Sequence, residues 1–441
     1  MKIEKPRNSN YCATVISIDK LVPLPKCDNV QAAIIFFNQI VVGKDVKVGD
    51  VGLYFPIECK LSDRFLSANN LYRHSEKNID QTKKGYFEDH GRIKAVKFRG
   101  NKSEGLFVGL NHLSFLLTTE EITSLKVGDE FDMLNDVKIC EKYIPRHNPP
   151  STKERHGKTI RTPRKTRVID KYFHFHIETC QFRKNVHRID PYSYIWVSSK
   201  IHGTSSIYAN VPVKKKLNWW QKFLRFVGAK IEEQEYDLLY SSRKVIKNNY
   251  VDTNPPNSGF YTQNIWEIVA NEIRACIGKG ITIYGEIVGY LPNGGWIQKD
   301  YHYGCKPGEH KFAVYRMTFT NDDGQVFEFN YHQIKEYCAR VGLTVVPFIY
   351  WGRACDMFPE IVVDDNWHSN FLDALEKKYV NDAKCALNNF EVVEEGIVVK
   401  MENMFNCEPM KLKNWEFLKK ESDDLNTADA PDIETQESLG Q

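Results

Sequence analysis

The stretch Tyr194-Ile-Trp-Val-Ser-Ser-Lys-Ile-His-Gly-Thr-Ser205 places a lysine and a glycine directly after an apolar run. Residues 194–199 form a short segment rich in aromatic and aliphatic side chains, which predicts a buried β-strand. Lys200 follows this strand, and Gly203 permits a tight turn and the close approach of a phosphate. A lysine held in this way is partly desolvated and can become a nucleophile when its pKa is lowered. By itself the pattern is common, and a surface lysine before a turn is the simpler explanation.

Further charged and aromatic residues lie in or beside apolar strands downstream. They occur in Ser242-Arg243, Tyr284-Gly-Glu286, Phe312-Ala-Val-Tyr315, Glu394-Glu-Gly-Ile-Val-Val-Lys400 and Lys411-Leu-Lys413. A charge on a buried strand is costly unless it binds something. Together these segments supply a lysine nucleophile, carboxylates for a ribose and a metal, an aromatic ring for a base, and cations for a triphosphate. Because the sequence has no GxxxxGK[ST] or GxGxxG phosphate loop, the set predicts covalent nucleotidyl transfer instead.

Composition sets wider limits on the protein class. The chain has 441 residues, 42% of them apolar and 27% charged, with a formal net charge of +3, which is typical of a soluble globular protein. No apolar stretch approaches the ~20 residues that cross a membrane, and the start MKIEKPRNSN lacks a signal-peptide pattern. Eleven cysteines without a CxxC pair favour reduced thiols over a disulfide framework or a zinc ribbon. We therefore expect a cytoplasmic protein without a membrane span.

Changes in pattern along the chain predict two domains, a linker and a tail. Short strand-like runs with turn residues between them indicate an OB-like β-barrel domain over residues 1–140. A proline- and base-rich linker or arm is expected at 141–190, and an α+β domain of strands mixed with amphipathic helices at 191–420. Residues 421–441 contain seven acids and no base, which predicts an acidic disordered tail. Without this tail the body carries a charge of about +10.

The sequence does not decide the roles of two basic segments. Residues 151–167 hold seven basic residues against one acid, and they are either a solvated linker or a contact for nucleic acid. The insert at 213–235 has the pattern of a basic amphipathic helix. Packing onto the body is the leading interpretation of the insert, ahead of contact with RNA and of docking to a membrane or a protein partner.

The ordered motifs resemble those of ATP-dependent RNA ligases in the covalent nucleotidyltransferase superfamily, within the nick-sealing, RNA-editing-ligase-like branch. The resemblance covers residues 190–420. Phrases at Arg92–Gly100 and Ser103–Leu106 are similar to the amino-terminal OB module of one subgroup. The implied fold is α+β: an OB-like β-barrel, then a nucleotidyltransferase (ATP-grasp-like ligase) domain of antiparallel sheets with flanking helices.

The resemblance implies a reaction and its cofactors. Lys200 would attack the α-phosphate of ATP and hold AMP, which then moves to an RNA 5′-phosphate before a 3′-hydroxyl displaces it. The implied cofactors are ATP and Mg²⁺, with Mn²⁺ as an alternative ion. The implied partner is RNA with 3′-hydroxyl and 5′-phosphate ends in a duplex, and the protein is expected to act as a monomer.

The resemblance also implies roles near the phosphates. Lys411 and Lys413 would contact the α-phosphate, and their alternation through Leu412 puts both on one face of a strand. His202 would lie near the phosphates, unless it is only a structural turn residue. Glu395 would bind the divalent metal directly or through water.

Other positions would hold the nucleotide itself. Glu286 would accept a ribose hydroxyl, and Arg243 would contact the ribose or the incoming 5′-phosphate, unless it forms a structural ion pair. Tyr315 or Phe312 would stack on the base. The remaining contacts are expected from Gly203, Thr204 and Lys400.

Two departures and two alternatives accompany the resemblance. Ser205 stands where the family often has Asn, and Tyr284 stands where its pattern has Phe. A capping-type guanylyltransferase or a DNA ligase on the same fold is one alternative. A non-catalytic, OB-containing nucleic-acid-binding protein is the other, although intact charges on apolar strands argue against it.

Overall fold

The computed structural model describes residues 1–144, 164–165, 167–248, 251–252, 261, 263–403, 405 and 408–424. Most of the basic arm expected at 151–167, and everything beyond Asp424, lies outside these residues. The chain divides into two compact units. The first comprises Met1–Pro145 with Leu418–Thr427, and the second contains Arg146–Phe417.

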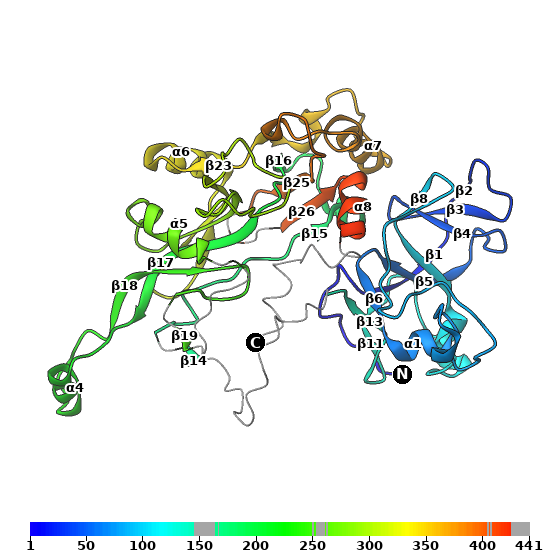
Figure 1. Ribbon diagram of the computed structural model, residues 1–441, viewed down its shortest axis with the longest axis horizontal. Coiled ribbons are helices and arrows are strands. Elements are labelled where there is room, and N and C mark those ends of the chain that lie inside the picture. Colours follow the sequence, from blue (N-terminus) through cyan, green and yellow to red (C-terminus); the bar gives the residue numbers. More distant parts are fainter. Residues whose placement is uncertain are drawn as a thin grey trace. The chain divides into compact units, whose positions relative to one another are not determined.

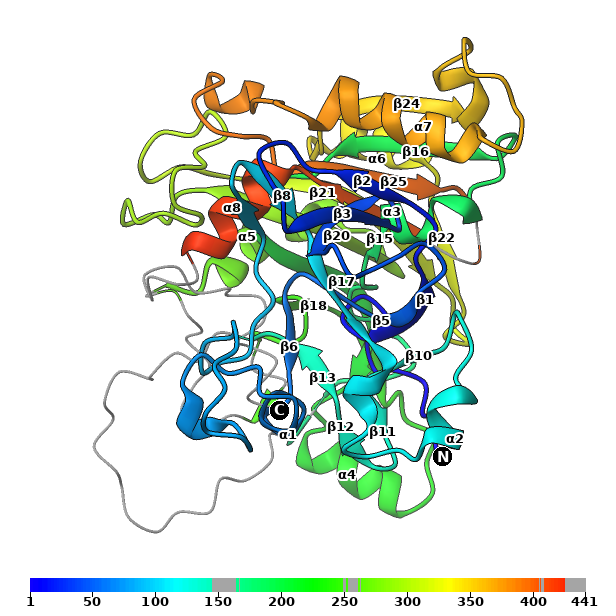
Figure 2. The ribbon, with the colours of Figure 1, turned by 90° about the vertical axis from the view of Figure 1, so that its right-hand side faces the viewer.

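Short antiparallel strands build the first unit (Figure 1, Figure 2). One sheet has the order β10-β1-β5-β9, and three further strands form the antiparallel set β2-β3-β4. The pairs β13-β6, β7-β8 and β11-β12 complete the strand content. The strand bounds are β1 (Ala13–Ser17), β2 (Leu21–Pro23), β3 (Val30–Ile35), β4 (Asn38–Gly43), β5 (Val51–Pro56), β6 (Cys59–Leu61), β7 (Val96–Phe98), β8 (Asn101–Ser103), β9 (Gly105–Gly109), β10 (Glu130–Phe131), β11 (Met133–Leu134), β12 (Val137–Lys138) and β13 (Cys140–Lys142).

The core of the first unit follows from the alternation of its strands. Leu53 and Phe55 from β5 pack with Phe131 from β10 and with Phe65, which lies on helix α1 (Asp63–Ala68). Helix α1 begins where the Ser62 hydroxyl accepts a hydrogen bond from the Phe65 amide, a common N-cap arrangement. A second short helix, α2 (Thr119–Thr123), starts with a complete capping box.

One strand expected from the sequence is in fact two. The apolar run Ala32–Val42 reads as a single strand, but the chain turns at Phe36 and Phe37, with φ of 48° and 61°. Ile35 pairs with Asn38 across this two-residue hairpin. Two-residue hairpin turns need positive φ, which bulky residues rarely supply. Because Phe36 and Phe37 stand where Asn-Gly is usual, the sequence gives no indication of this turn.

Two sheets form the second unit (Figure 1). One has the order β15-β26-β25-β16-β24, and the other has the order β18-β17-β20-β21-β22, with β23 parallel to β21; β14 and β19 pair separately. The strand bounds are β14 (Arg164–Lys165), β15 (Cys180–Gln181), β16 (Tyr194–Ser199), β17 (Thr204–Lys214), β18 (Gln234–Ser241), β19 (Val251–Asp252), β20 (Ile281–Gly289), β21 (His310–Thr320), β22 (Val326–Glu328), β23 (Thr344–Val345), β24 (Phe348–Arg353), β25 (Gly396–Met401) and β26 (Glu408–Lys413).

Helices cover these sheets through apolar faces spaced as the sequence predicts. Trp266 and Val269 on one helix and Ile334 on another pack with Ile283 and Val314 of the second sheet. Phe371 and Leu375 on a third helix pack against the first sheet. The helix bounds are α3 (Phe182–Asn185), α4 (Trp219–Phe226), α5 (Ile265–Ile273), α6 (Tyr331–Val341), α7 (Trp367–Leu375) and α8 (Trp415–Asp424).

The linker expected at 141–190 is wrong in its second half. Val168, Tyr172 and Phe173 are buried in one core of the second unit, and Phe182 and Val186 in another. These apolar residues follow no regular period. The sequence pattern is therefore dominated by the nearby prolines and basic residues, which are typical of a linker.

The disordered tail expected at 421–441 is wrong for residues 421–424, and the rest of it lies outside the described residues. Helix α8 continues to Asp424, and Ser422 is buried. Glu421, Asp423 and Asp424 lie on this helix. The charge pattern predicts disorder here because it takes no account of the buried Ser422.

The helix of the insert at 213–235 does not pack onto the described body. This helix, α4, lies between β17 and β18, and Trp219, Trp220, Phe223, Leu224 and Phe226 are all exposed. The preference for packing is therefore wrong for these side chains.

Ten of the eleven cysteines fall within the described residues, and all ten are free thiols. Within the same part of the chain, no helix has the length and apolar character needed to cross a bilayer.

A buried ion pair in the first unit gives a stability prediction. The Arg92 guanidinium donates to both carboxylate oxygens of Glu58 at 2.9 and 2.7 Å, and Ser422 donates to Glu58 at 3.1 Å. We expect Arg92→Met to lower the free energy of unfolding by about 3–5 kcal/mol, because it leaves a largely buried carboxylate without its cation. Urea unfolding, followed by hydrogen exchange in β5 and β6, measures the loss.

Burial already raises the pKa of Glu58 above its usual value, although Arg92 opposes the effect. Folding therefore favours the protonated carboxyl, and the penalty of Arg92→Met should be smaller at pH 5 than at pH 8. The exposed pair Arg73–Glu88 supplies the control, since Arg73→Met should cost less than about 1 kcal/mol. Equal losses for both variants would contradict the account.

Candidate active site

A short turn after β16 links the two sheets of the second unit. Strand β16 ends at Ser199 in one sheet, and β17 starts at Thr204 in the other, so residues 200–203 cross between them. The Lys200 amide donates to the Gly396 carbonyl at 2.8 Å, which fixes the start of the turn against β25. The lysine predicted from sequence therefore stands at the junction of both sheets.

The buried carboxylate of Glu395 brings three predicted residues together. Its Oε1 lies 2.8 Å from Lys200 Nζ and 3.3 Å from Lys413 Nζ. Its Oε2 lies 3.9 Å from His202 Nδ1. Glu395 is only 3% exposed, whereas both lysine side chains retain partial exposure. A buried anion thus holds two lysines whose side chains remain partly exposed.

The backbone around Glu395 requires a glycine at the next position. Gly396 has φ of 141°, and a Cβ there would lie 2.1 Å from the Leu412 carbonyl oxygen. The Glu395 carbonyl accepts from the Asn414 amide at 2.9 Å, which ties the carboxylate-bearing segment to the end of β26. A glycine directly after Glu395 is therefore a geometric requirement of this site.

His202 lies in a pocket of aromatic rings that the sequence motifs did not reveal. Its ring meets Tyr301 and Phe417 edge-on, with centroids 5.1 Å away in both cases. Its amide donates to the Tyr303 hydroxyl at 2.6 Å. Burial, aided by the charge of Glu395, raises the pKa of Tyr301, so its hydroxyl stays protonated and donates to the Val393 carbonyl at 2.8 Å. In the sequence, these rings around His202 are indicated only by the aromatic run around residues 301–303.

The close approach of two backbones explains Gly203. A Cβ at this position would lie 2.5 Å from the Ile287 carbonyl oxygen and 3.1 Å from Glu286 Cβ. The Gly203 carbonyl accepts from Gln298 Nε2 at 2.9 Å. Gly203 thus lets the turn press against β20, next to the predicted ribose ligand Glu286.

Strand alternation separates the cations of β26 from its core residues. Leu412 and Met410 are buried in the core that also holds α7, whereas Lys411 and Lys413 are on the opposite face. The same face carries Val398 opposite Lys411. The shared face expected for the two lysines is present, and Lys413 on this face pairs with Glu395.

Lys400 has a different environment from the one predicted. Its Nζ lies 3.7 Å from Glu328 Oε2 and 5.8 Å from the centre of the Trp196 ring. Arg316 also pairs with Glu328, and all three charged side chains are buried. This cluster accounts for the charge of Lys400 without a ligand, so its assignment as a nucleotide contact gains no support.

The other predicted residues lie on neighbouring strands. Thr204 is buried at the start of β17, and Ser205 pairs with Glu286 across the β17–β20 ladder. The Tyr315 hydroxyl lies 3.3 Å from Ser205 Oγ, at a bulge in β21 that turns this ring away from strict alternation. Arg243 is half-buried in the turn that follows β18.

Phe312 is less suited to base stacking. It is buried in the core, where it packs edge-on against Tyr208 with ring centroids 5.0 Å apart. Tyr315 is only partly buried. Of the two rings left open by the sequence, Tyr315 is therefore the more available.

Glu395 fits a metal-binding role with help from a substrate. Its Oε2 is buried and has no hydrogen-bond partner among the described residues. The same residues contain no group of three or more His, Cys, Asp or Glu side chains that could hold a metal. Mg²⁺ commonly binds through one or two carboxylates, with phosphate oxygens and water completing its shell. One carboxylate beside a bound phosphate is sufficient for such a site.

The strand-end lysine, the buried carboxylate and the second lysine lie together at the junction of the two sheets, an arrangement that fits the class of nucleotidyltransferases. Family comparison is more specific: the RNA ligase family matches residues 193–415, and an OB-fold domain family matches residues 12–110. The chain belongs to the RNA ligase family, with an amino-terminal OB-fold domain. No curated protein sequence matches it significantly.

Solved structures of Naegleria gruberi RNA ligase share the fold. A variant with AMP and Mn has 14% sequence identity and a TM-score of 0.56, covering 92% of this chain and 98% of that one. A variant with ATP and Mn has 13% identity and a TM-score of 0.55, covering 94% and 100%. The predicted α+β fold, an OB-like barrel followed by a sheet-rich ligase domain with flanking helices, is confirmed.

The turn between the sheets yields a second prediction. Gly203→Ala should lower the free energy of unfolding by about 1–3 kcal/mol, because the added Cβ collides with a backbone oxygen that cannot move freely. Urea unfolding measures the change. Gly278→Ala is the matched control, since its Cβ would meet only side-chain atoms, at 3.6 and 3.7 Å. A control loss as large as that of Gly203→Ala would refute the packing argument.

Proposed function

We propose that this protein is an ATP-dependent RNA ligase that joins a 3′-hydroxyl to a 5′-phosphate through a covalent lysyl-AMP intermediate. The observation that carries the proposal is the shared pairing of Glu395 with Lys200 and Lys413, at 2.8 and 3.3 Å. A nucleophilic lysine needs a fixed position, and transfer of a nucleotide needs a second cation beside it. The carboxylate of Glu395 fixes Lys200 and holds Lys413 beside it.

In the first step Lys200 forms a bond to the α-phosphate of ATP. Its ammonium loses a proton, the nitrogen lone pair forms the P–N bond, and the bond from the α-phosphorus to the bridging oxygen breaks. Pyrophosphate leaves with that electron pair, and the nitrogen loses a second proton to give the phosphoramidate, whose nitrogen is uncharged. Lys411 and Lys413, on one face of β26, would stabilise the negative charge that develops on the phosphoryl oxygens.

Contacts to the rest of the nucleotide follow from the neighbouring strands. Glu286 would accept a ribose hydroxyl, and Tyr315 would stack on the base. His202, whose backbone is fixed by Tyr303, would contact a phosphate oxygen. A divalent cation held by Glu395 and a phosphate would supply Lewis-acid neutralisation of phosphate charge. The relatives with AMP or ATP and Mn support this choice of nucleotide and ion.

Two further transfers would complete the joining of RNA ends. A 5′-phosphate oxygen of RNA attacks the lysyl-AMP, so the P–N bond breaks and an AMP-capped 5′ end forms. The 3′-hydroxyl then attacks the capped phosphate, a phosphodiester bond forms, and AMP leaves. We propose that the ends are held in a nicked duplex, so that the duplex and not the protein aligns them. We further propose a monomeric enzyme of the cytoplasm, where the ten free cysteines among the described residues would stay reduced.

The lysyl-AMP proposal predicts an adduct. Wild-type protein incubated with Mg²⁺ and ATP labelled at the α-phosphate should acquire acid-labile label, and Lys200→Ala should acquire none. Lys335→Ala removes an exposed lysine on α6 and is the control. Gel electrophoresis with autoradiography measures the label. Its absence from the wild-type protein would sink the proposal, and labelling from GTP alone would indicate capping chemistry.

Nucleic-acid substrates separate the later steps. Lys200→Ala should still seal a nicked RNA duplex whose 5′ end already carries AMP, because that end bypasses the lysine. Failure with this substrate, when the variant folds normally, would contradict the assigned role. Equal sealing of all-DNA nicks by the wild-type protein would overturn the RNA assignment, and preference for single strands would overturn the duplex.

A further inference from the structure

Helix α4 is a locally specified element. The Asn218 side chain accepts from the Gln221 amide at 2.8 Å, and the Gln221 side chain accepts from the Asn218 amide at 2.9 Å, which completes a capping box. The helix ends at Phe226, with Val227 as its C-cap and Gly228 next, at φ of 83°. Caps at both ends favour a formed helix even without tertiary packing. The chain thus builds this helix at the tip of the β17–β18 hairpin (Figure 1).

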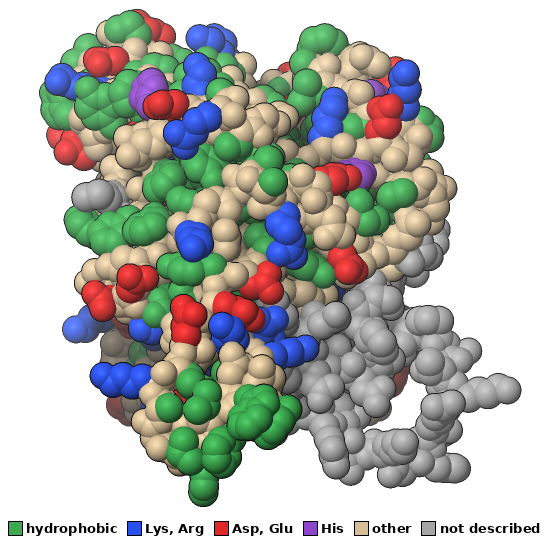
Figure 3. Space-filling model, turned by 90° about the vertical axis from the view of Figure 1, so that its left-hand side faces the viewer, with side chains coloured by type: hydrophobic (Ala, Val, Ile, Leu, Met, Phe, Trp, Pro, Cys, Tyr) green, Lys and Arg blue, Asp and Glu red, His purple; other side chains and the backbone are tan. Residues whose placement is uncertain are grey.

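One face of α4 is apolar and uncovered. At 100° per residue, six apolar side chains occupy an arc of about 160°, whereas Gln221, Lys222 and Arg225 occupy the opposite side. All six are exposed, with Trp219 at 67% and Phe226 at 87%; the set is Trp219, Trp220, Phe223, Leu224, Phe226 and Val227. Hydrophobic side chains gather at this end of the molecule in Figure 3. A patch of this kind marks an interaction surface.

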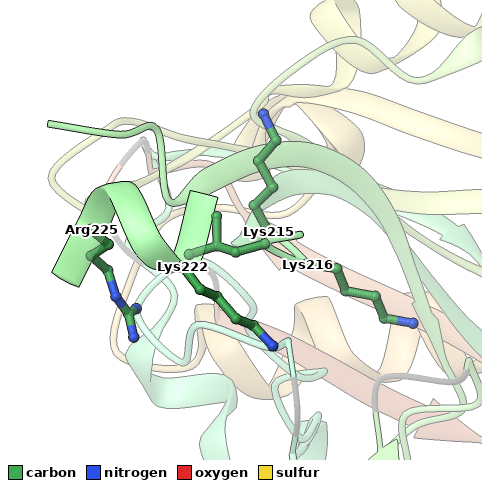
Figure 4. A pocket seen from close by; sticks show the side chains of 5 residues that line it. Lys215, Lys216, Lys222 and Arg225 are labelled. Carbon is green, nitrogen blue, oxygen red and sulfur yellow. The ribbon is translucent and has the colours of Figure 1, made fainter. Parts of the chain in front are cut away.

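The surroundings of α4 are strongly basic. Residues 214–231 contain six Lys or Arg and no acid. Lys215 lies 3.7 Å from Glu232 and Arg225 lies 3.6 Å from Glu233, but Lys222 has no ion-pair partner among the described residues. Lys222 and Arg225 extend to the same side, around a surface hollow that Lys215 and Lys216 also line (Figure 4). The partner should therefore carry both apolar surface and negative charge.

We propose that α4 docks the protein onto an anionic lipid surface. In an interfacial helix, Trp, Phe and Leu enter the boundary between headgroups and acyl chains, while Lys and Arg on the other face meet the anionic headgroups. Helix α4 has this division of residues. RNA would satisfy the cations but leave Leu224, Phe226 and Val227 in water, and Trp219 and Trp220 already stack on each other at 4.1 Å. A second copy of the patch would bring like charges together.

The position of α4 leaves the candidate active site accessible. Strand β17 runs from Thr204, beside the Lys200 turn, to Lys214, beside α4. Ten steps of about 3.3 Å separate these ends by roughly 33 Å. Docking at the tip would hold the ligase domain at a surface without covering Lys200. The inference thus goes beyond the proposed function and does not depend on it.

Vesicle binding tests the proposal on the full chain. We expect the wild-type protein to sediment with vesicles of phosphatidylcholine and phosphatidylserine (7:3), and to bind pure phosphatidylcholine vesicles at least tenfold more weakly. Trp219→Ser/Phe226→Ser should reduce binding to the anionic vesicles at least tenfold. Lys222→Glu should weaken it and reduce its salt dependence. Ile79→Ser, at another exposed apolar residue that is 74% exposed, should bind as the wild type does.

Other results would overturn the proposal. No binding to anionic vesicles, or equal binding by the wild type and Trp219→Ser/Phe226→Ser, would refute it. If that double variant instead lost affinity for nicked RNA, α4 would be an RNA contact. If sedimentation showed a dimer that the substitutions dissolve, α4 would be a self-association surface. Circular dichroism of each variant checks that the fold is retained.

Discussion

The buried carboxylate of Glu395 is the interaction on which the site depends. It is 3% exposed, yet it pairs with two lysines that remain partly accessible. A buried charge is costly to leave unpaired, so the fold must keep Lys200 and Lys413 near it. This cost makes the geometry rigid: any movement of either lysine away from Glu395 leaves a charge in a poorly solvated place.

The rest of the second unit supports this arrangement. Residues 200–203 pass from one sheet to the other, and Gly203 lets them lie against the backbone of β20. On the other side, Gly396 lets β25 approach β26 closely enough to place Glu395 between its partners. Two sheets with separate cores thus meet at a lysine, and neither sheet alone could form the site.

Sequence reasoning recovered the features that depend on local pattern. The alternation of Lys411, Leu412 and Lys413 predicted which side chains share a face, because a strand has a period of two. The ordered motifs predicted that Lys200, His202 and Glu395 belong together. These predictions rest on residues that carry their own chemical or periodic signal.

Features that depend on distant contacts were missed. The turn at Phe36-Phe37 lacks the usual residues and is imposed by the pairing of β3 with β4. Tyr303 holds His202 from a loop a hundred residues away, and Lys400 pairs with Glu328 on a different sheet. The exposed face of α4 was misjudged because amphipathicity alone does not say what covers it.

A double-mutant cycle tests most directly whether Glu395 holds the two lysines as one unit. The single-turnover rate of labelling from α-phosphate-labelled ATP would be measured for the wild type, Glu395→Gln, Lys413→Met and the double variant. Shared organisation predicts that Lys413→Met costs several-fold less in the Glu395→Gln background than in the wild type, with coupling of about 0.5–3 kcal/mol. Strictly additive losses would show that the two residues act independently and would contradict the account.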